Sequence, residues 1–198
     1  MSTAPSTEIS LLSLNDAKVW LGSTGDTDND GMICDLINSV SARFEAETGR
    51  KLKSRSYTEI RDGTGKNWMY AYNYPFSSTT ITITIDEARA FTDTDDQVTS
   101  TDIQLTTGSG KIWLDNTVFD VGERNVQISY TAGFSTSEEY NLVQAAKEYI
   151  SLLWSRRTNA IPTGVITEGY EGGSRTYEDN LPWSVRQILN MYRESRVV

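Results

Sequence analysis

Carboxylates are the main side chains in this sequence that could do chemistry, because it contains no histidine and one cysteine, Cys34. The absence of imidazole excludes Ser-His-Asp and Cys-His catalysis and histidine-ligated zinc. One cysteine cannot form an internal disulfide or a cysteine-based zinc site, which indicates a reducing compartment or an assembly without cross-links. Any catalysis would therefore need carboxylates, tyrosine, lysine or a hard cation.

The sharpest motif is residues 26–33, which begin with DTDNDG and match the first eight positions of an EF-hand calcium loop. Its twelfth position holds Ile37, which cannot supply the bidentate carboxylate that the loop needs. One interpretation is a weak calcium site, and its ligands would be Asp26, Asp28 and Asp30. The other is the start of a helix that Asp28 or Asn29 caps and that the neighbouring acids favour.

Three further patterns resemble catalytic or ligand sites less closely. The Gly-Lys pairs at residues 65–66 and 110–111 lack both the earlier glycine and the following Ser or Thr of a phosphate loop, so hairpin turns explain them better. The acids between residues 86 and 102 lie in a polar segment without an apolar pocket, which favours a solvated loop over a glycosidase pair. Trp68, Tyr70 and Tyr72 could stack on a sugar or a base, but strand aromatics more often form core or subunit interface. The sequence therefore predicts a binding protein, with no enzyme activity and no cofactor.

Charge is distributed unevenly along the chain. The formal net charge of −9 argues against a general nucleic-acid-binding protein, which would neutralise phosphates with a basic surface. Residues 1–48 carry eight acidic and two basic side chains, whereas residues 49–61 carry five basic and one acidic. These cations could meet an acidic surface of a neighbouring copy, or protect a solvated strand edge. With the strand aromatics, the predicted subunit interface is Arg50, Lys51, Lys53, Arg55, Arg61, Trp68, Tyr70 and Tyr72.

Stretches with helical periodicity lie on both sides of the middle of the chain. Ser13 is placed to cap a helix over residues 14–21. Apolar residues at spacings of three and four predict a second helix over residues 32–49 that ends at a glycine. Thr136 and Glu139 fit a capping box for a third helix, whose wide apolar side predicts the centre of the core.

Strand periodicity fills the middle of the chain. The sequence TITITI at residues 80–85 places three isoleucines on one face of a strand. Similar patterns predict strands at residues 68–72, 103–105, 112–114 and 126–130. The result is an α+β fold, a small helical bundle formed by N- and C-terminal helices with a central β sub-domain insertion and an extended C-terminal arm ending in a short helix. The predicted parts are an arm and helices at 1–54, the β sub-domain at 55–134, a core helix at 135–160, and the C-terminal arm and helix at 161–198.

The C-terminal arm is predicted to need a partner surface. Residues 158–180 hold four glycines and little apolar material, which indicates an extended segment. Pro182 then begins a short helix with an apolar stripe about two turns long, which is marginal in water by itself. Either another protein's groove or the chain's own bundle could cover the stripe. The residues predicted to dock are Trp183, Val185, Arg186, Ile188, Leu189, Tyr192 and Arg193.

The order of these segments resembles the tailed-bacteriophage head-to-tail connector family, also called adaptor or head completion proteins. The resemblance covers about residues 12–192, and the segments that carry it are ETGRKL at 47–52, YTEIRDGTG at 57–65, YTAGF at 130–134, and AAKEY at 145–149 running to two arginines at 156–157. It implies a virion protein that forms a ring, usually of twelve copies, beneath the portal. The partners would be the portal protein, neighbouring copies of the chain, and a stopper or tail-completion protein on the tail side.

The resemblance also implies that the groove for the C-terminal helix belongs to the portal, and that the protein is located in the virion neck. Double-stranded DNA would pass without specific binding, because a net-negative lumen repels it within the Debye length of roughly 8–10 Å. The sequence predicts neither a secretory signal nor a membrane span, so we expect synthesis in the host cytoplasm and no membrane partner. The alternative is a calcium- or carbohydrate-binding module that uses residues 26–31 and the Trp68 strand.

Overall fold

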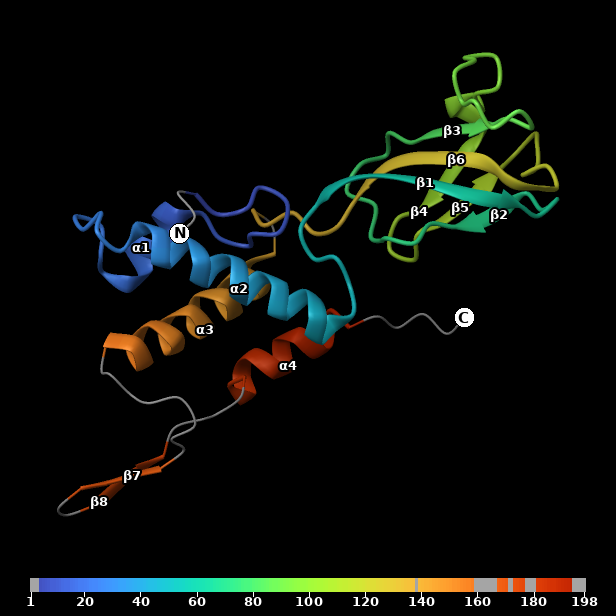
Figure 1. The fold of residues 1–198 in the computed structure, drawn as a ribbon. Coiled ribbons are helices and arrows are strands. Elements are labelled where there is room, and N and C mark those ends of the chain that lie inside the picture. The colour runs from blue at the N-terminus through green and yellow to red at the C-terminus, as the bar shows by residue number, and fades with distance from the viewer. Residues whose placement is uncertain (1–3, 138, 159–166, 171–172, 177–180, 194–198) are drawn as a thin grey trace. The chain divides into compact units, whose positions relative to one another are not determined.

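The computed structural model describes residues 4–137, 139–158, 167–170, 173–176 and 181–193 (Figure 1). The described chain forms two units. The helical unit consists of the described residues up to Arg50 and from Thr136 onward, and the β unit consists of Lys51–Ser135. The β unit is thus inserted between helices of the other unit, and the predicted α+β fold is confirmed.

The helical unit contains four helices, α1 (Leu14–Leu21), α2 (Asp30–Thr48), α3 (Tyr140–Thr158) and α4 (Trp183–Met191). As predicted, the Ser13 hydroxyl caps α1 by accepting a hydrogen bond of 3.1 Å from the Asp16 amide. Gly49 ends α2 in the left-handed conformation that a residue without Cβ adopts easily, with φ of 70°. The capping box predicted at Thr136 is wrong, because α3 begins four residues later and the Glu139 carboxylate accepts a hydrogen bond from Tyr192 instead.

Side chains from three helices form the core of the helical unit. Helix α2 contacts α1, α3 and α4, and α3 also contacts α1 and α4. The rings of Phe44 and Tyr149 stack between α2 and α3 with their centroids 6.1 Å apart. The fully buried large side chains of this unit are Ile33, Ile37, Phe44, Leu142, Ile150 and Leu189.

The β unit contains two three-stranded antiparallel sheets (Figure 1). The first has the order β1 (Arg55–Gly63), β6 (Gly122–Ala132), β3 (Thr82–Ile85), and the second has the order β2 (Trp68–Tyr70), β5 (Lys111–Leu114), β4 (Ile103–Thr106). A short 3-10 turn at Ser100–Asp102 precedes β4. The hairpin of β4 and β5 and the strands around residues 68, 83 and 128 confirm the predicted strands.

Alternate residues of both sheets point into one apolar core. Ile83 lies opposite Ile128 in the register of β3 and β6, and both are fully buried. The second sheet contributes Met69, Ile112 and Leu114 to the same cluster. The odd-numbered isoleucines of the TITITI segment face this core as predicted, although Ile85 is only partly buried.

The segment predicted to be an extended arm contains a hairpin. Strands β7 (Thr167–Tyr170) and β8 (Gly173–Thr176) pair in antiparallel register. The remainder of that segment, residues 159–166, 171–172 and 177–180, lies outside the described residues. None of the helices described here has the length and apolar character to cross a membrane.

Candidate subunit interface

The exposed face of the second sheet gathers aromatic rings and lysines. Trp68 and Tyr70 flank the buried Met69 on β2, so both project away from the core. The antiparallel register places Trp113 opposite Trp68 and Lys111 opposite Tyr70. With Lys66, which precedes β2, these residues form a surface that we call the aromatic–lysine face: Lys66, Trp68, Tyr70, Lys111 and Trp113.

Cation–π contacts order the aromatic–lysine face. The Lys111 ammonium lies 4.1 Å from the Trp113 ring centroid and 4.9 Å from that of Trp68. The Lys66 ammonium lies 4.8 Å from the Trp68 ring, and the Trp68 and Tyr70 rings meet edge to face at 5.7 Å. Each such cation–π contact is worth about 0.5–1 kcal/mol at an exposed site. Because these contacts restrain the rings before binding, the face can bind a partner with little further loss of side-chain entropy.

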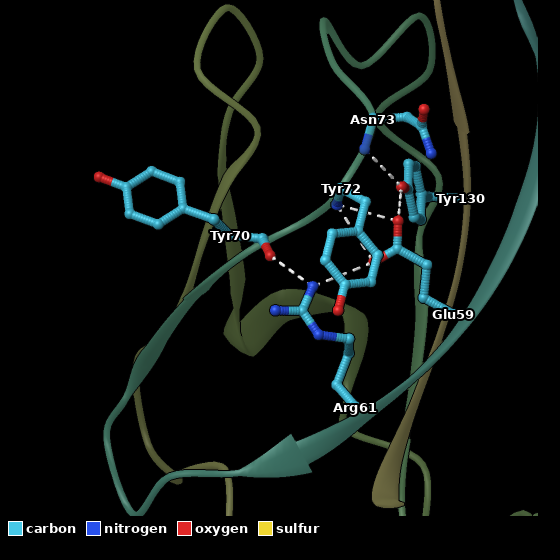
Figure 2. Close-up of polar contacts among 6 residues, drawn as sticks. All are labelled: Glu59, Arg61, Tyr70, Tyr72, Asn73 and Tyr130. Carbon is cyan, nitrogen blue, oxygen red and sulfur yellow. Dashed lines mark hydrogen bonds and ion pairs between the residues drawn. The ribbon is translucent and has the colours of Figure 1, made fainter. Parts of the chain in front are cut away.

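A buried carboxylate holds the neighbouring loop against the first sheet (Figure 2). Both oxygens of Glu59 on β1 accept hydrogen bonds from the Tyr72 amide, at 2.9 and 3.1 Å, and the Tyr130 hydroxyl donates to the same carboxylate. The Tyr130 oxygen in turn accepts a 3.0 Å hydrogen bond from the Asn73 amide. Burial and the hydrogen bond to Glu59 raise the pKa of Tyr130 well above its ordinary value. Residues 72–73 are therefore fixed to β1 and β6.

Arg61 completes this network (Figure 2). Its guanidinium group lies 3.3 Å from the Glu59 carboxylate, donates a 3.1 Å hydrogen bond to the Tyr70 carbonyl, and stacks on the Tyr72 ring at 3.8 Å from the centroid. The sequence leaves two predictions for Arg61, a cation that meets a neighbour's acids or one that protects a solvated strand edge. The structure shows instead that Arg61 is used within its own chain, where it supports the more exposed Tyr70 and Tyr72.

The other predicted interface residues take different positions. Arg50 belongs to the helical unit and donates a 3.4 Å hydrogen bond to the Tyr192 carbonyl. Arg55 donates from Nε to the Tyr57 hydroxyl at 2.8 Å, and burial lowers the pKa of Lys53. Lys51 is exposed where the chain enters the β unit. Of the eight predicted residues, Arg61, Trp68, Tyr70 and Tyr72 lie together, because ring, cation–π and hydrogen-bond contacts join them.

Sequence reasoning missed Lys111 and Trp113, although a signal was present. Trp113 lies on the strand predicted at residues 112–114, and Lys111 directly precedes it; in the structure this strand pairs with the strand around Trp68. Antiparallel pairing of those two strands would have placed an aromatic residue and a cation opposite Trp68 and Tyr70. The signal was incomplete because the register is fixed by contacts far apart in sequence.

The C-terminal helix packs against its own unit, which corrects its predicted role as a free anchor. Val185, Leu189 and Tyr192 are buried, and α4 contacts both α2 and α3. The Tyr192 hydroxyl donates a 2.6 Å hydrogen bond to Glu139, and burial together with this bond raises the pKa of Tyr192. The apolar stripe is covered by the bundle because a two-turn helix gains most of its stability from such packing.

The polar side of α4 remains accessible. Trp183 has 70% of its surface exposed, and Arg186 and Arg193 are exposed as well. Ile188 is partly buried. Of the seven residues predicted to dock, these four stay available to a partner while the other three complete the core.

The loop that resembles an EF-hand uses its carboxylates for internal contacts. Asp26 accepts hydrogen bonds from the Asp28 amide at 2.8 Å and the Asn29 side chain at 2.6 Å, and these bonds lower its pKa. Asp30 forms an ion pair of 2.5 Å with Lys18. Within the part of the chain that the structure describes, no group of three or more His, Cys, Asp or Glu side chains is placed to hold a metal. Helix α2 begins here, as the second interpretation predicts, with Asn29 at the N-cap position, but the Asn29 side chain makes no capping hydrogen bond.

Comparison with known proteins gives one family and several structures of the same fold. Among the solved structures that the chain resembles is one from the neck of an empty GTA particle computed with C6 symmetry, with 17% identity and a TM-score of 0.63 over 100% of this chain and 98% of that chain. Another is from the virion of a native gene transfer agent particle, with 18% identity and a TM-score of 0.59 over 95% of this chain and 92% of that chain. A third is from the neck of a native GTA particle computed with C12 symmetry, with 17% identity and a TM-score of 0.58 over 100% of this chain and 98% of that chain. At these identities the likeness shows a shared fold. No curated protein matches the chain. A family model described as head completion protein matches residues 10–195, nearly the whole sequence, and the chain therefore belongs to the head completion protein family.

Proposed function

We propose that this protein is a structural component of the virion neck, a head-to-tail adaptor that forms a ring beneath the portal, joins capsid to tail and lets DNA pass. The observation that carries the proposal is the match of residues 10–195 to the head completion family. The shared fold with chains from the necks of GTA particles adds support. The proposed role is one of binding.

A ring of identical copies requires two unlike surfaces that fit each other and close. The aromatic–lysine face is one candidate surface, because exposed aromatic residues are enriched at the centres of protein interfaces. The proposed copy number is twelve, which the C12 symmetry of one similar neck structure supports. The net charge of −9 suits a ring through which DNA passes without specific binding.

The proposed contact with the portal uses the accessible side of α4. Trp183 supplies an exposed aromatic anchor, and Arg186 and Arg193 supply cations for an acidic groove. A stopper or tail-completion protein would bind on the tail side of the ring.

Light scattering of the purified protein, alone and mixed with its portal, tests the proposal. We expect a ring in the presence of the portal, which can template assembly of a protein that is monomeric alone. Trp183→Ala should weaken portal binding without changing the melting temperature, since the indole side chain of Trp183 is largely exposed to solvent. A protein that remains monomeric in both conditions would contradict the proposed ring.

A further inference from the structure

A second surface of the β unit carries features that the proposed function does not use. A hollow of about 180 Å³ opens where the first sheet meets the loop that follows β3. Its lining residues are Ile60 on β1, Arg124 on β6, and Arg89 and Phe91 in the loop. The pairing of β1 with β6 is irregular between Arg61 and Gly63, beside this hollow.

Three of the four lining residues have an unusual backbone conformation. Arg89, Phe91 and Arg124 have φ values of 61°, 53° and 52°, and they are the non-glycine residues with positive φ in the described chain. This left-handed region is unfavourable for L-residues with bulky side chains, and residues held in it cluster at binding and catalytic sites. Here all three surround one hollow, so the strain has a common location.

Two carboxylates hold this conformation in place. The Asp86 side chain accepts hydrogen bonds from the amides of Ala88, Ala90 and Phe91, at 2.7, 2.8 and 2.8 Å. These backbone hydrogen bonds lower the pKa of Asp86. Asp62 likewise accepts a 2.7 Å hydrogen bond from the Arg124 amide. Each carboxylate binds the main chain of a strained residue and leaves the arginine side chain for other contacts.

The two arginine side chains offer unused binding capacity. Arg89 and Arg124 are exposed, and no hydrogen bond or ion pair of either guanidinium group occurs among the described residues. A guanidinium group can bind a carboxylate through two parallel hydrogen bonds, and both arginines line the hollow beside Phe91 and Ile60. The hollow therefore has the chemistry of a receptor for an acidic side chain.

We infer that this hollow binds an acidic side chain from residues 1–48 of a second copy of this chain in the ring. The inference rests on the proposed ring function, and the occupant is assigned from the acidic character of residues 1–48. Residues 1–48 carry eight acidic and two basic side chains, and Glu8, Asp28 and Glu47 among them are exposed. The contact pairs a hollow of the β unit that two arginines line with an acidic surface of the neighbour's helical unit, as a closed ring of unlike faces requires.

The first test removes the two guanidinium groups. Arg89→Ala with Arg124→Ala should weaken ring assembly with the portal by about tenfold or more for each arginine removed. The matched control, Arg157→Ala, removes an exposed arginine of the helical unit and should assemble like the wild type. Arg124→Gly should assemble poorly without a lowered melting temperature, because glycine adopts positive φ readily. Normal assembly of the double variant would overturn the inference and leave the proposed ring intact.

The second test identifies the occupant. A photo-crosslinking phenylalanine analogue at Ile60, activated in assembled particles, should link to residues 1–48 of another copy. Links to the portal, to DNA or to a different segment of the neighbour would overturn the inference. If the wild type forms no ring with the portal, the proposed function and this inference fail together, which separates that result from failure of the hollow alone.

Discussion

Truncation of Leu189 tests whether α4 is part of the folded core or an anchor for a partner. Leu189 is 2% exposed and lies on the side of α4 that packs in the helical unit. Leu189→Ala removes buried carbon atoms and leaves a cavity, which costs about 2–5 kcal/mol of unfolding free energy. A loss of about 3 kcal/mol would lower the melting temperature by roughly 6–12 °C for a chain of this size. Leu189→Asp should be more damaging, because it adds a buried charge without a partner.

The assay is thermal and urea unfolding of the full chain followed by far-ultraviolet circular dichroism. Met191→Ala is the matched control, because Met191 lies in the same helix with 69% of its surface exposed. Its unfolding free energy should stay within about 0.5 kcal/mol of the wild type. Equal melting temperatures for the wild type and Leu189→Ala would refute the packing of α4, and the helix would then be a free docking element.

Three further perturbations test the β unit and the buried tyrosines. Glu59→Gln should lower the unfolding free energy by about 1–3 kcal/mol in urea, because one amide oxygen cannot replace both carboxylate oxygens; unchanged stability would contradict this role. Trp113→Ala, at a residue 36% exposed, should weaken the free energy of ring assembly by more than about 2 kcal/mol while the fold is retained. Normal assembly of this variant, measured by light scattering, would show that the aromatic–lysine face is not part of the interface. The raised pKa values of Tyr130 and Tyr192 predict that stability falls as the pH rises above their ordinary pKa of 10, because the unfolded chain then releases protons that the folded chain keeps. An ultraviolet titration in which all tyrosines ionise over the same pH range would contradict the raised pKa values of Tyr130 and Tyr192.

Local signals in the sequence predicted most of the secondary structure. Ser13 and Gly49 act within one turn of the helices that they cap, so their identity alone places two boundaries. The alternation at residues 80–85 likewise fixes which side chains face the core, because successive side chains of a strand point to opposite faces. These features depend on neighbours in sequence and need no knowledge of tertiary contacts.

Features that depend on contacts between residues far apart in the sequence could not be predicted from local patterns. The apolar stripe of α4 is compatible with a partner's groove or with its own bundle, and the choice depends on contacts such as Tyr192 with Glu139, 53 residues apart. The resemblance of residues 26–33 to a calcium loop did not reveal that Lys18 would pair with Asp30. The positive φ of Arg89 and Arg124 had no signal in the sequence, because neither is a residue type that favours this conformation.

Cryo-electron microscopy of particles that contain this protein is the most direct test of the proposed neck ring. The proposal predicts a closed ring of density between portal and tail into which both the helical unit and the β unit fit, repeated around the axis. A neck density that neither unit fits, or particles whose heads join tails normally when this protein is absent, would contradict it.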